Sequence, residues 1–342
     1  MGIIAHDLGM DLGTSNTLVY VKHKGIVVSE PTIAVVEATN ERHVRAIGND
    51  AKIMLGRTTE GVMAVKPMRE GVITDFDITK ILIKYFIRKA IGSSYLIRPQ
   101  MFLSYPCSLS SIERRAVSEA ARSAGCRKVY MIEKPFLAAL GSGLPVFEAN
   151  GCMVVDIGGG TTDVAVLSLG GTVISHSIRV GGAKLDEAII SFIQREFNIL
   201  IGDRTAEEVK LDLSAALPLR EERRARIRGR DMVTNLPQTT EINSTQIYEA
   251  IHEPCMAILG AIKWVLERTP PELAADIMHN GIYLTGGGSL LYGLDQLIAS
   301  ELGIPVLLAK EPMDCAALGL GNVIENFELL QHLGRTSFLK QF

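Results

Sequence analysis

The chain has 342 residues, of which 47% are hydrophobic and 21% are charged, and its formal net charge is −3. This length suits two domains with large cores, and the weak negative charge gives no reason to expect a nucleic-acid partner. No apolar run reaches the roughly 18 residues that a spanning helix needs, so a membrane span is not expected. The first residues lack the basic start and long apolar stretch of a signal peptide. The five cysteines form no CxxC pair, and we expect free thiols.

The first predicted structure is a hairpin around residues 11–17. An apolar stretch ends at Met10, the segment Asp-Leu-Gly-Thr-Ser-Asn-Thr follows, and a second apolar run covers residues 18–21. This order predicts a strand, a glycine turn with hydroxyl side chains, and a second strand. A glycine turn lets backbone amides approach an anion, and Asp11 places a carboxylate beside that turn.

The next part of the chain alternates between helical and strand patterns. Residues 32–66 are polar and irregular, which is consistent with a small subdomain. The elements expected after it are a helix over 77–91, a strand over 101–105, a helix over 113–125 capped by Ser110 or Ser111, a strand over 129–132, and a helix after Pro135. Such alternation predicts α/β lobes.

The octapeptide of residues 156–163, Asp-Ile-Gly-Gly-Gly-Thr-Thr-Asp, is the most informative segment. Apolar runs on both sides predict a second strand–turn–strand unit. Three consecutive glycines let backbone amides converge on an anion, the threonines add donors, and the carboxylates can hold magnesium directly or through water. The segment favours a hairpin that grips a metal-bound polyphosphate, with an ordinary glycine-rich hairpin as the alternative. Two such units suggest two related half-domains.

A third glycine cluster, residues 286–289, follows the apolar run 282–285 and opens a helix that we predict over 290–298. Free amides at a helix start suit the phosphate or sugar edge of a nucleotide. No Gly-Lys-Ser or Gly-Lys-Thr follows any of the three turns, which excludes a P-loop. The first two turns lead into strands, which excludes a dinucleotide fingerprint.

The arginine-rich segment 219–230 resembles a nucleic-acid patch by its charge alone. Glutamates are interleaved with the arginines, and no aromatic residue lies nearby to stack on a base. We therefore expect a solvated charged strand or loop and no nucleic-acid partner.

Together, the three turns resemble those of the actin, sugar-kinase and heat-shock-chaperone ATPase superfamily. Further segments narrow the resemblance to the bacterial actin MreB family, from about residue 7 to about residue 330. These segments are 25–31, 66–73, 113–116, 202–207 and 269–273. The resemblance implies an α/β, actin-like fold with two duplicated domains around a nucleotide cleft. It places domain I at 1–145 and 320–342, with a small subdomain at about 32–70, and domain II at 146–319, with an outer subdomain at about 182–245.

The same resemblance implies the site residues, with ATP and Mg²⁺ as cofactors. Asp11 and Asp156 would organise the magnesium ion. The expected phosphate-binding residues are Gly13, Thr14, Ser15, Asn16, Gly158, Gly159, Gly160, Thr161 and Thr162. The residues expected around the rest of the nucleotide are Asp186, Glu207, Glu208, Lys210, Gly286, Gly287, Gly288, Ser289 and Leu290. For Asp186, a solvated charge near a helix N-terminus is an equally good interpretation.

One departure from the family pattern bears on catalysis. The family reads Ile-Glu-Glu-Pro where this chain reads Ile-Glu133-Lys134-Pro, so Lys134 replaces the glutamate that orients the attacking water. A carboxylate accepts a hydrogen bond from water, whereas an ammonium only donates. We therefore expect a weak ATPase, with Glu133, Lys134, Asp156 and Thr161 as candidate catalytic residues. Lys134 could instead pair with the γ-phosphate, or point to solvent and leave the role to Glu133.

The expected function is an ATP-binding cytoskeletal protein that polymerises into protofilaments for cell shape or a related mechanical role. Its expected location is the cytoplasm, at the inner face of the cell membrane, and its expected partners are other copies of itself, actin-like paralogues and that membrane. Tyr95, Leu96 and Ile97 form an apolar loop tip that predicts membrane contact, unless these side chains fold back onto the core. The alternatives are a small-molecule kinase of the same superfamily, which needs an acceptor pocket with a catalytic aspartate, and a chaperone ATPase.

Overall fold

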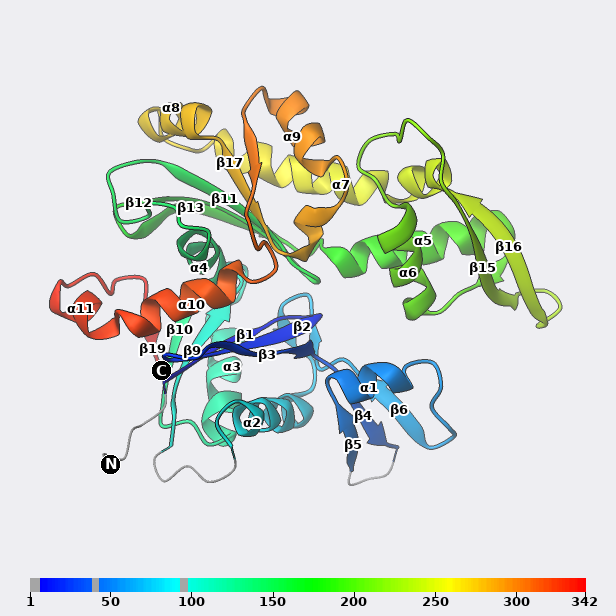
Figure 1. Cartoon of the computed structure of the whole chain (residues 1–342), viewed down its shortest axis with the longest axis horizontal. Coiled ribbons are helices and arrows are strands. Elements are labelled where there is room, and N and C mark those ends of the chain that lie inside the picture. Colours follow the sequence, from blue (N-terminus) through cyan, green and yellow to red (C-terminus); the bar gives the residue numbers. More distant parts are fainter. Residues whose placement is uncertain (1–6, 39–42, 93–97) are drawn as a thin grey trace.

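The computed structural model describes residues 7–38, 43–92 and 98–342. The described chain forms two lobes, each built on its own mixed β-sheet, and the two sheets lie one above the other in Figure 1. The predicted membrane tip, residues 95–97, lies outside the described residues.

The sheet of the first lobe has the strand order β19-β10-β9-β1-β2-β3. Its strands are β1 (Asp7–Leu12), β2 (Asn16–Val21), β3 (Gly25–Pro31), β9 (Gln100–Tyr105), β10 (Lys128–Glu133) and β19 (Lys340–Gln341). Strands β1, β2 and β3 are antiparallel neighbours, whereas β9 and β10 continue the sheet parallel to β1. Helices α2 (Phe76–Ile91) and α3 (Ser111–Ser123) cover the outer face of this sheet (Figure 1).

The second lobe repeats this arrangement with the strand order β13-β12-β11-β17-β18. Its strands are β11 (Cys152–Ile157), β12 (Thr162–Ser168), β13 (Gly171–Ile178), β17 (Ile282–Thr285) and β18 (Val306–Leu308). Its helices are α5 (Gly182–Phe197), α7 (Ser244–Leu266), α8 (Pro271–Asn280) and α9 (Leu294–Leu302). Again the first three strands are antiparallel neighbours and the next is parallel to the first. This repeat confirms the predicted α/β fold with two related halves.

A smaller unit extends each lobe. The first lobe carries β4 (Ala34–Glu37), β5 (Val44–Ile47), α1 (Asn49–Met54), β6 (Val62–Val65), β7 (Met68–Arg69) and β8 (Val72–Ile73). The second lobe carries β14 (Ile199–Leu200), α6 (Asp203–Leu213), β15 (Arg224–Asp231) and β16 (Pro237–Asn243). The short helix α11 (Phe327–His332) follows later in the chain.

Residues 32–66 are more regular than their sequence predicts. Strands β5, β4 and β6 form a sheet, so the expectation of an irregular segment is wrong. Ala34, Val35 and Val36 are buried in succession, on both faces of β4. A strand covered on both sides shows no alternation of apolar and polar residues, which explains why the pattern did not reveal it.

Capping residues and glycines mark the starts of helices α3 and α9. Helix α3 begins after Ser110, whose hydroxyl accepts a hydrogen bond from the amide of Glu113, while the Ser110 amide donates one to the Glu113 carboxylate. The helix predicted over 290–298 instead starts at Leu294. A short 3₁₀ turn, Gly287–Leu290, comes first, and Gly293, with a left-handed φ of 75°, is then the N-cap of α9.

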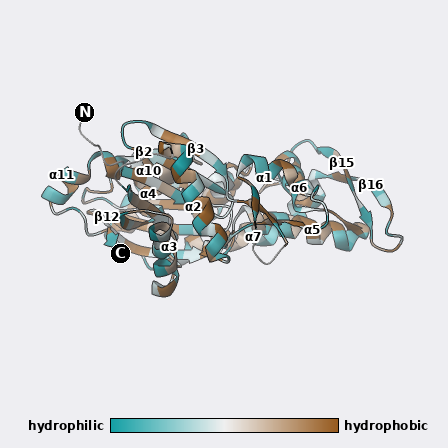
Figure 2. Cartoon of the chain, turned by 90° about the horizontal axis from the view of Figure 1, so that it is seen from below, coloured by the Kyte–Doolittle hydropathy of each residue, from teal (hydrophilic) through white to brown (hydrophobic). Residues whose placement is uncertain are grey.

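The arginine-rich segment leads into β15, the central strand of the β14-β15-β16 sheet, as expected for a solvated charged strand or loop. Ile227 faces the core, while Arg226 and Arg228 on either side of it are exposed. Arg224 forms ion pairs with Glu222, just before β15, and with Glu241 of β16 across the hairpin. Hydrophilic and hydrophobic residues also alternate along helices such as α2 and α5 in Figure 2, as expected for helices that cover a sheet. Among the described residues, no helix is both long and apolar enough to cross a bilayer.

Helices α4 (Lys134–Gly141) and α10 (Cys315–Glu325) lie between the two sheets (Figure 1). One buried hydrophobic cluster joins Phe102 of the first sheet, Leu320 of α10 and Val154 of the second sheet. The helices cross at two glycines. A Cβ added at Gly141 would overlap the carbonyl oxygen of Cys315, and one added at Gly319 would overlap the carbonyl oxygen of Leu137.

We predict that Gly319→Ala destabilises the protein by about 1–3 kcal/mol, because the new methyl group forces the two helix backbones apart. Gly260→Ala is the matched control, since a Cβ at this exposed glycine of α7 meets nothing within 4 Å. The control gains about 0.5–1 kcal/mol from helix propensity. Urea unfolding of the two variants measures both effects, and equal stabilities would contradict the predicted close crossing.

Candidate functional site

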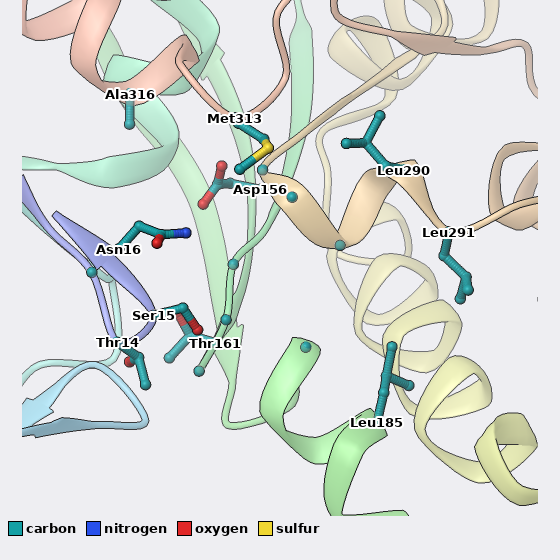
Figure 3. Close-up of a pocket in the computed structure, with 18 of the residues that line it drawn as sticks. Thr14, Ser15, Asn16, Asp156, Thr161, Leu185, Leu290, Leu291, Met313 and Ala316 are labelled. Carbon is teal, nitrogen blue, oxygen red and sulfur yellow. The ribbon is translucent and has the colours of Figure 1, made fainter. Parts of the chain in front are cut away.

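A cavity of about 370 Å³ lies between the lobes, and both predicted turns open into it (Figure 3). It meets a second, wider cavity of about 960 Å³, with which it shares Ser15, Asn16 and Lys210. The predicted site residues that line the first cavity are Asp11, Gly13, Thr14, Ser15, Asn16, Lys134, Asp156, Gly158, Gly159, Gly160, Thr161, Glu207, Lys210, Gly286, Gly287, Gly288 and Leu290. The chain therefore brings three separate glycine clusters and two aspartates to one place.

The two hairpin turns have the same backbone geometry. In the first, the amide of Gly13 donates to the carbonyl of Asn16 at 3.1 Å; in the second, the amide of Gly158 donates to the carbonyl of Thr161 at 2.8 Å. Each turn follows an aspartate at the end of a central strand. The two hairpins occupy equivalent positions in their sheets. Their turns therefore reach the cavity in the same way, one from each lobe.

The turns also touch one another across the cleft, and glycine is what permits this. A Cβ added at Gly159 would overlap the hydroxyl of Ser15, and one added at Gly160 would overlap the hydroxyl of Thr14. The Thr14 hydroxyl also accepts a hydrogen bond of 3.1 Å from the amide of Gly71. The sequence did not identify Gly71 as a site residue. Its φ of +77° at the β7–β8 turn is one that glycine adopts readily.

Some predicted site residues lie apart from the first cavity. Thr162 is buried and donates to the carbonyl of Val180 at 2.7 Å, and Ser289 is buried and donates to the carbonyl of Gly286 at 2.6 Å. Neither lines either of the two cavities. Their hydroxyls therefore support the loops rather than face a ligand.

The acidic residues on α5 and α6 also have partners. Asp186 and Glu208 line only the wider cavity. Asp186 forms a 2.8 Å ion pair with Lys210, while Glu208 pairs with Arg204 at 3.0 Å. Burial raises the pKa of the Asp186 carboxyl, although the Lys210 ammonium opposes this shift. Lys210 also donates to the carbonyl of Gly182 at 3.1 Å, which fixes its ammonium at the edge of the first cavity.

Glu133 lines neither of the two cavities. Its carboxylate accepts a 2.9 Å hydrogen bond from the Thr172 hydroxyl and lies 3.8 Å from the Lys340 ammonium. Because Glu133 and Lys134 are adjacent where β10 meets α4, their side chains point in different directions. The structure therefore gives no support to Glu133 as a replacement for the missing glutamate.

Lys134 points into the cavity rather than to solvent, and its side chain is only 15% exposed. Its Nζ lies 3.1 Å from Oδ2 of Asp156 and 3.8 Å from Oδ2 of Asp11. Burial alone lowers the pKa of a lysine, but the carboxylates of Asp11, Asp156 and Asp163 outweigh it, so the pKa of Lys134 is raised. The residue therefore remains charged near neutral pH.

The aspartates are held by their own partners. Oδ1 of Asp11 accepts a hydrogen bond from the Ser104 hydroxyl, and Oδ1 of Asp156 accepts one from Thr285 at 3.0 Å. The remaining oxygen of each carboxylate, Oδ2, faces Lys134. Sequence reasoning did not identify Ser104 or Thr285, because each comes from a neighbouring strand rather than from the turns.

Asp163 is a third carboxylate beside this pair. It accepts hydrogen bonds from the amide of Cys107 at 2.9 Å and from the hydroxyl of Thr161 at 3.0 Å. Burial, helped by the nearby Asp156 carboxylate, raises the pKa of Asp163 to about 6. Thr161 is thereby oriented by Asp163, at the mouth of the second turn.

The residues present do not fit a magnesium ion bound directly by the two aspartates. Mg²⁺ requires oxygen ligands at about 2.0–2.1 Å in near-octahedral order. The described residues contain no group of three or more histidine, cysteine, aspartate or glutamate side chains placed to hold a metal. Moreover, the oxygens that Asp11 and Asp156 would offer already face the ammonium of Lys134.

The opposite side of the cavity is apolar. Leu290 and Leu291 line it beside the third glycine cluster, and Leu185 lines it from α5 (Figure 3). A pocket with polar turns at one end and aliphatic side chains at the other suits a ligand with an anionic tail and a flat apolar ring. The polar turns match the phosphates of a nucleotide, and the aliphatic side chains match its base.

Among the described residues, four exposed ion pairs cross between the lobes. They are Lys52–Glu207 at 3.6 Å, Lys66–Asp203 at 2.8 Å, Arg69–Glu187 at 3.4 Å and Arg179–Glu70 at 3.4 Å. All eight side chains are more than a third exposed. Each pair therefore contributes little to stability.

Comparison with known proteins agrees with this fold. The chain is 46% identical to the cell shape-determining protein Mbl of Bacillus subtilis, over 96% of this chain and 98% of that protein. It is also 46% identical to the cell shape-determining protein MreB of Escherichia coli, over 96% of each chain.

Two solved structures extend the comparison. MreB5 of Spiroplasma citri bound to AMPPNP has a TM-score of 0.90 and 33% identity, over 96% of this chain and 99% of that one. The MamK double helical filament has a TM-score of 0.78, over 94% of this chain and 99% of that one, but only 20% identity, so it supports the actin-like fold alone. The model of the MreB/Mbl protein family matches residues 5–332. On this evidence, the chain belongs to the MreB/Mbl family.

Proposed function

We propose that the chain binds ATP in the cleft and polymerises into cytoskeletal filaments that act in cell shape. The observation that carries the proposal is the pair of equivalent glycine turns, one from each lobe, which meet over a single cavity. Backbone amides in such turns bind anions without a side chain. A phosphate chain between the turns would contact both lobes, which links nucleotide binding to the closure of the cleft.

The relatives support the same proposal. Mbl of B. subtilis and MreB of E. coli are both named cell shape-determining proteins. Structures of MreB5 of S. citri are bound to AMPPNP and to ADP. The proposed location is the inner face of the cell membrane, with other copies of the chain and actin-like paralogues as partners. End-to-end contacts between identical protomers are heterologous, so they propagate into a filament.

A small-molecule kinase of the same superfamily is less well supported. Such an enzyme needs a carboxylate base that faces the acceptor. The Oδ2 atoms of Asp11 and Asp156 face Lys134, and Asp163 is bonded to Cys107 and Thr161. These three carboxylates are therefore engaged already.

We predict that Gly159→Ala lowers ATP affinity about tenfold or more, because the new methyl group pushes Ser15 away and separates the two turns. Gly171→Ala serves as the control, since a Cβ there meets only ordinary van der Waals contact. Calorimetric titration with the non-hydrolysable analogue AMPPNP measures the affinities. Equal binding by both variants would argue against phosphates between the turns.

Hydrolysis is expected to be weak, since Lys134 cannot accept a hydrogen bond from water. Lys134→Glu in the presence of Mg²⁺ should raise phosphate release about tenfold or more, within the range that a positioned acid or base contributes. Lys84→Glu, which makes the same charge change at an exposed site on α2, should leave the rate unchanged. Fast release by the parent protein, or no gain in Lys134→Glu, would refute this role.

Membrane binding through the tip of residues 95–97 should depend on polymerisation. One protomer offers few apolar side chains and so binds the membrane weakly, whereas a filament presents many copies of them at once. The double variant Leu96→Ser, Ile97→Ser should polymerise with ATP, as light scattering measures, but no longer sediment with anionic liposomes. A control double variant, Val233→Ser and Leu236→Ser, removes exposed apolar side chains from the β15–β16 hairpin. Loss of sedimentation in the control alone would reassign the membrane contact to that hairpin.

A further inference from the structure

The ammonium of Lys134 is enclosed by two carboxylates and a glycine turn. Asp156 and Asp11 face it at 3.1 and 3.8 Å, and the glycine turn of the second lobe passes beside it, where a Cβ at Gly158 would lie 3.5 Å from Nζ. It is therefore enclosed by two carboxylates and the turn that is proposed to hold phosphates.

No other cation in the described lining of this cavity stands in the same place. Lys210 is bound to Asp186 and to the carbonyl of Gly182, and Arg223 reaches the cavity from the segment before β15. A polyphosphate between the turns would meet the negative charges of Asp11 and Asp156 with Lys134 as the nearby counter-charge.

A divalent cation and this ammonium cannot share the space between the two carboxylates. Like charges within about 4 Å repel strongly at the low effective dielectric of a partly buried site. The ammonium also holds the Oδ2 atoms at hydrogen-bond and ion-pair distances, which are longer than Mg²⁺ coordination distances of about 2.0–2.1 Å. For a metal to enter, Lys134 has to leave, and two buried carboxylates then lose their counter-charge.

We propose that Lys134 is a tethered counter-cation that takes the place of the divalent metal, so that the chain binds nucleoside triphosphate without requiring Mg²⁺. This inference rests on the proposed nucleotide site and specifies its cation requirement. An ammonium has three donors; two carboxylates engage it here, and the third donor is available to a phosphate oxygen. The charge that a free ion would bring with the nucleotide is instead part of the polypeptide.

The same arrangement gives a second reason for weak hydrolysis. A metal ion stabilises the charge that develops on the transferred phosphoryl group and its leaving oxygen. A single ammonium carries half the charge of Mg²⁺ and is shared with two aspartates. The site then favours retention of the triphosphate over its cleavage.

The direct test uses the parent protein alone. AMPPNP affinity is measured by calorimetry in EDTA and in millimolar Mg²⁺. We expect the two dissociation constants to agree within about threefold. Binding that appears only with Mg²⁺ would overturn the tethered-cation inference and leave the proposed nucleotide site intact. No binding in either condition would overturn the nucleotide site itself, and this inference with it.

Three variants sharpen the test. Lys134→Met removes the charge and keeps a long unbranched side chain. In EDTA its affinity for AMPPNP should fall about tenfold or more, because a hydrogen bond to a charged group is lost. Addition of Mg²⁺ should restore this affinity. Lys134→Arg keeps the charge and should bind in EDTA like the parent. Lys84→Met makes the same change at an exposed site on α2 and should show no dependence on Mg²⁺.

These variants also keep the inference testable if Lys134→Met does not fold. Thermal unfolding without nucleotide shows whether Lys134→Met is folded. If it is not, the test compares the AMPPNP affinities of the parent and Lys134→Arg in EDTA and in Mg²⁺. Metal-independent binding by both supports a role for the positive charge at this position. A Lys134→Met protein that folds and binds in EDTA as tightly as the parent would contradict the inference.

Discussion

The close backbone contact between α4 and α10 is the constraint on which the geometry of the cleft depends. Gly141 and Gly319 let the helices cross with no side chain between them; α10 packs against the first sheet, and α4 contacts strands of both sheets. The first residue of α4 is Lys134, so the contact that joins the lobes also sets where the ammonium lies. Packing at one end of an eight-residue helix thereby determines electrostatics at the other.

The repeat of the two lobes is incomplete at one informative position. Asp11 pairs across its hairpin with Leu18, whereas Asp156 pairs across the equivalent hairpin with Asp163. The second lobe therefore contributes an extra carboxylate near the shared cavity. An uncompensated cluster of buried carboxylates is costly, and the ammonium of Lys134 supplies a compensating positive charge. The two hairpins therefore differ at the position where the second one carries an additional negative charge, Asp163.

Sequence alone predicted the parts of the fold that depend on local chemistry. The glycine turns, the Ser110 cap and the repeated hairpins follow from short-range rules, and the resemblance supplied the two-lobed arrangement. The direction of Lys134 could not be predicted in this way, because it depends on helix packing. Thr162 and Ser289 were placed in the site for a related reason: a turn sequence does not show which hydroxyls face the cavity and which bond to neighbouring backbone. The sheet within residues 32–66 was missed because burial on both faces removes the alternation that marks a strand.

The exposed ion pairs between the lobes have a different physical character from the helix contact between α4 and α10. The helix contact is buried and apolar, so dissolved salt hardly affects it. The pairs from Lys52, Lys66, Arg69 and Arg179 are exposed, and mobile ions screen them within about a Debye length of 8–10 Å at moderate ionic strength. The two lobes are thus joined by a buried apolar contact and by exposed ion pairs. Dissolved salt weakens the exposed pairs and leaves the buried contact unchanged, so the two kinds of contact between the lobes differ in their response to ionic strength.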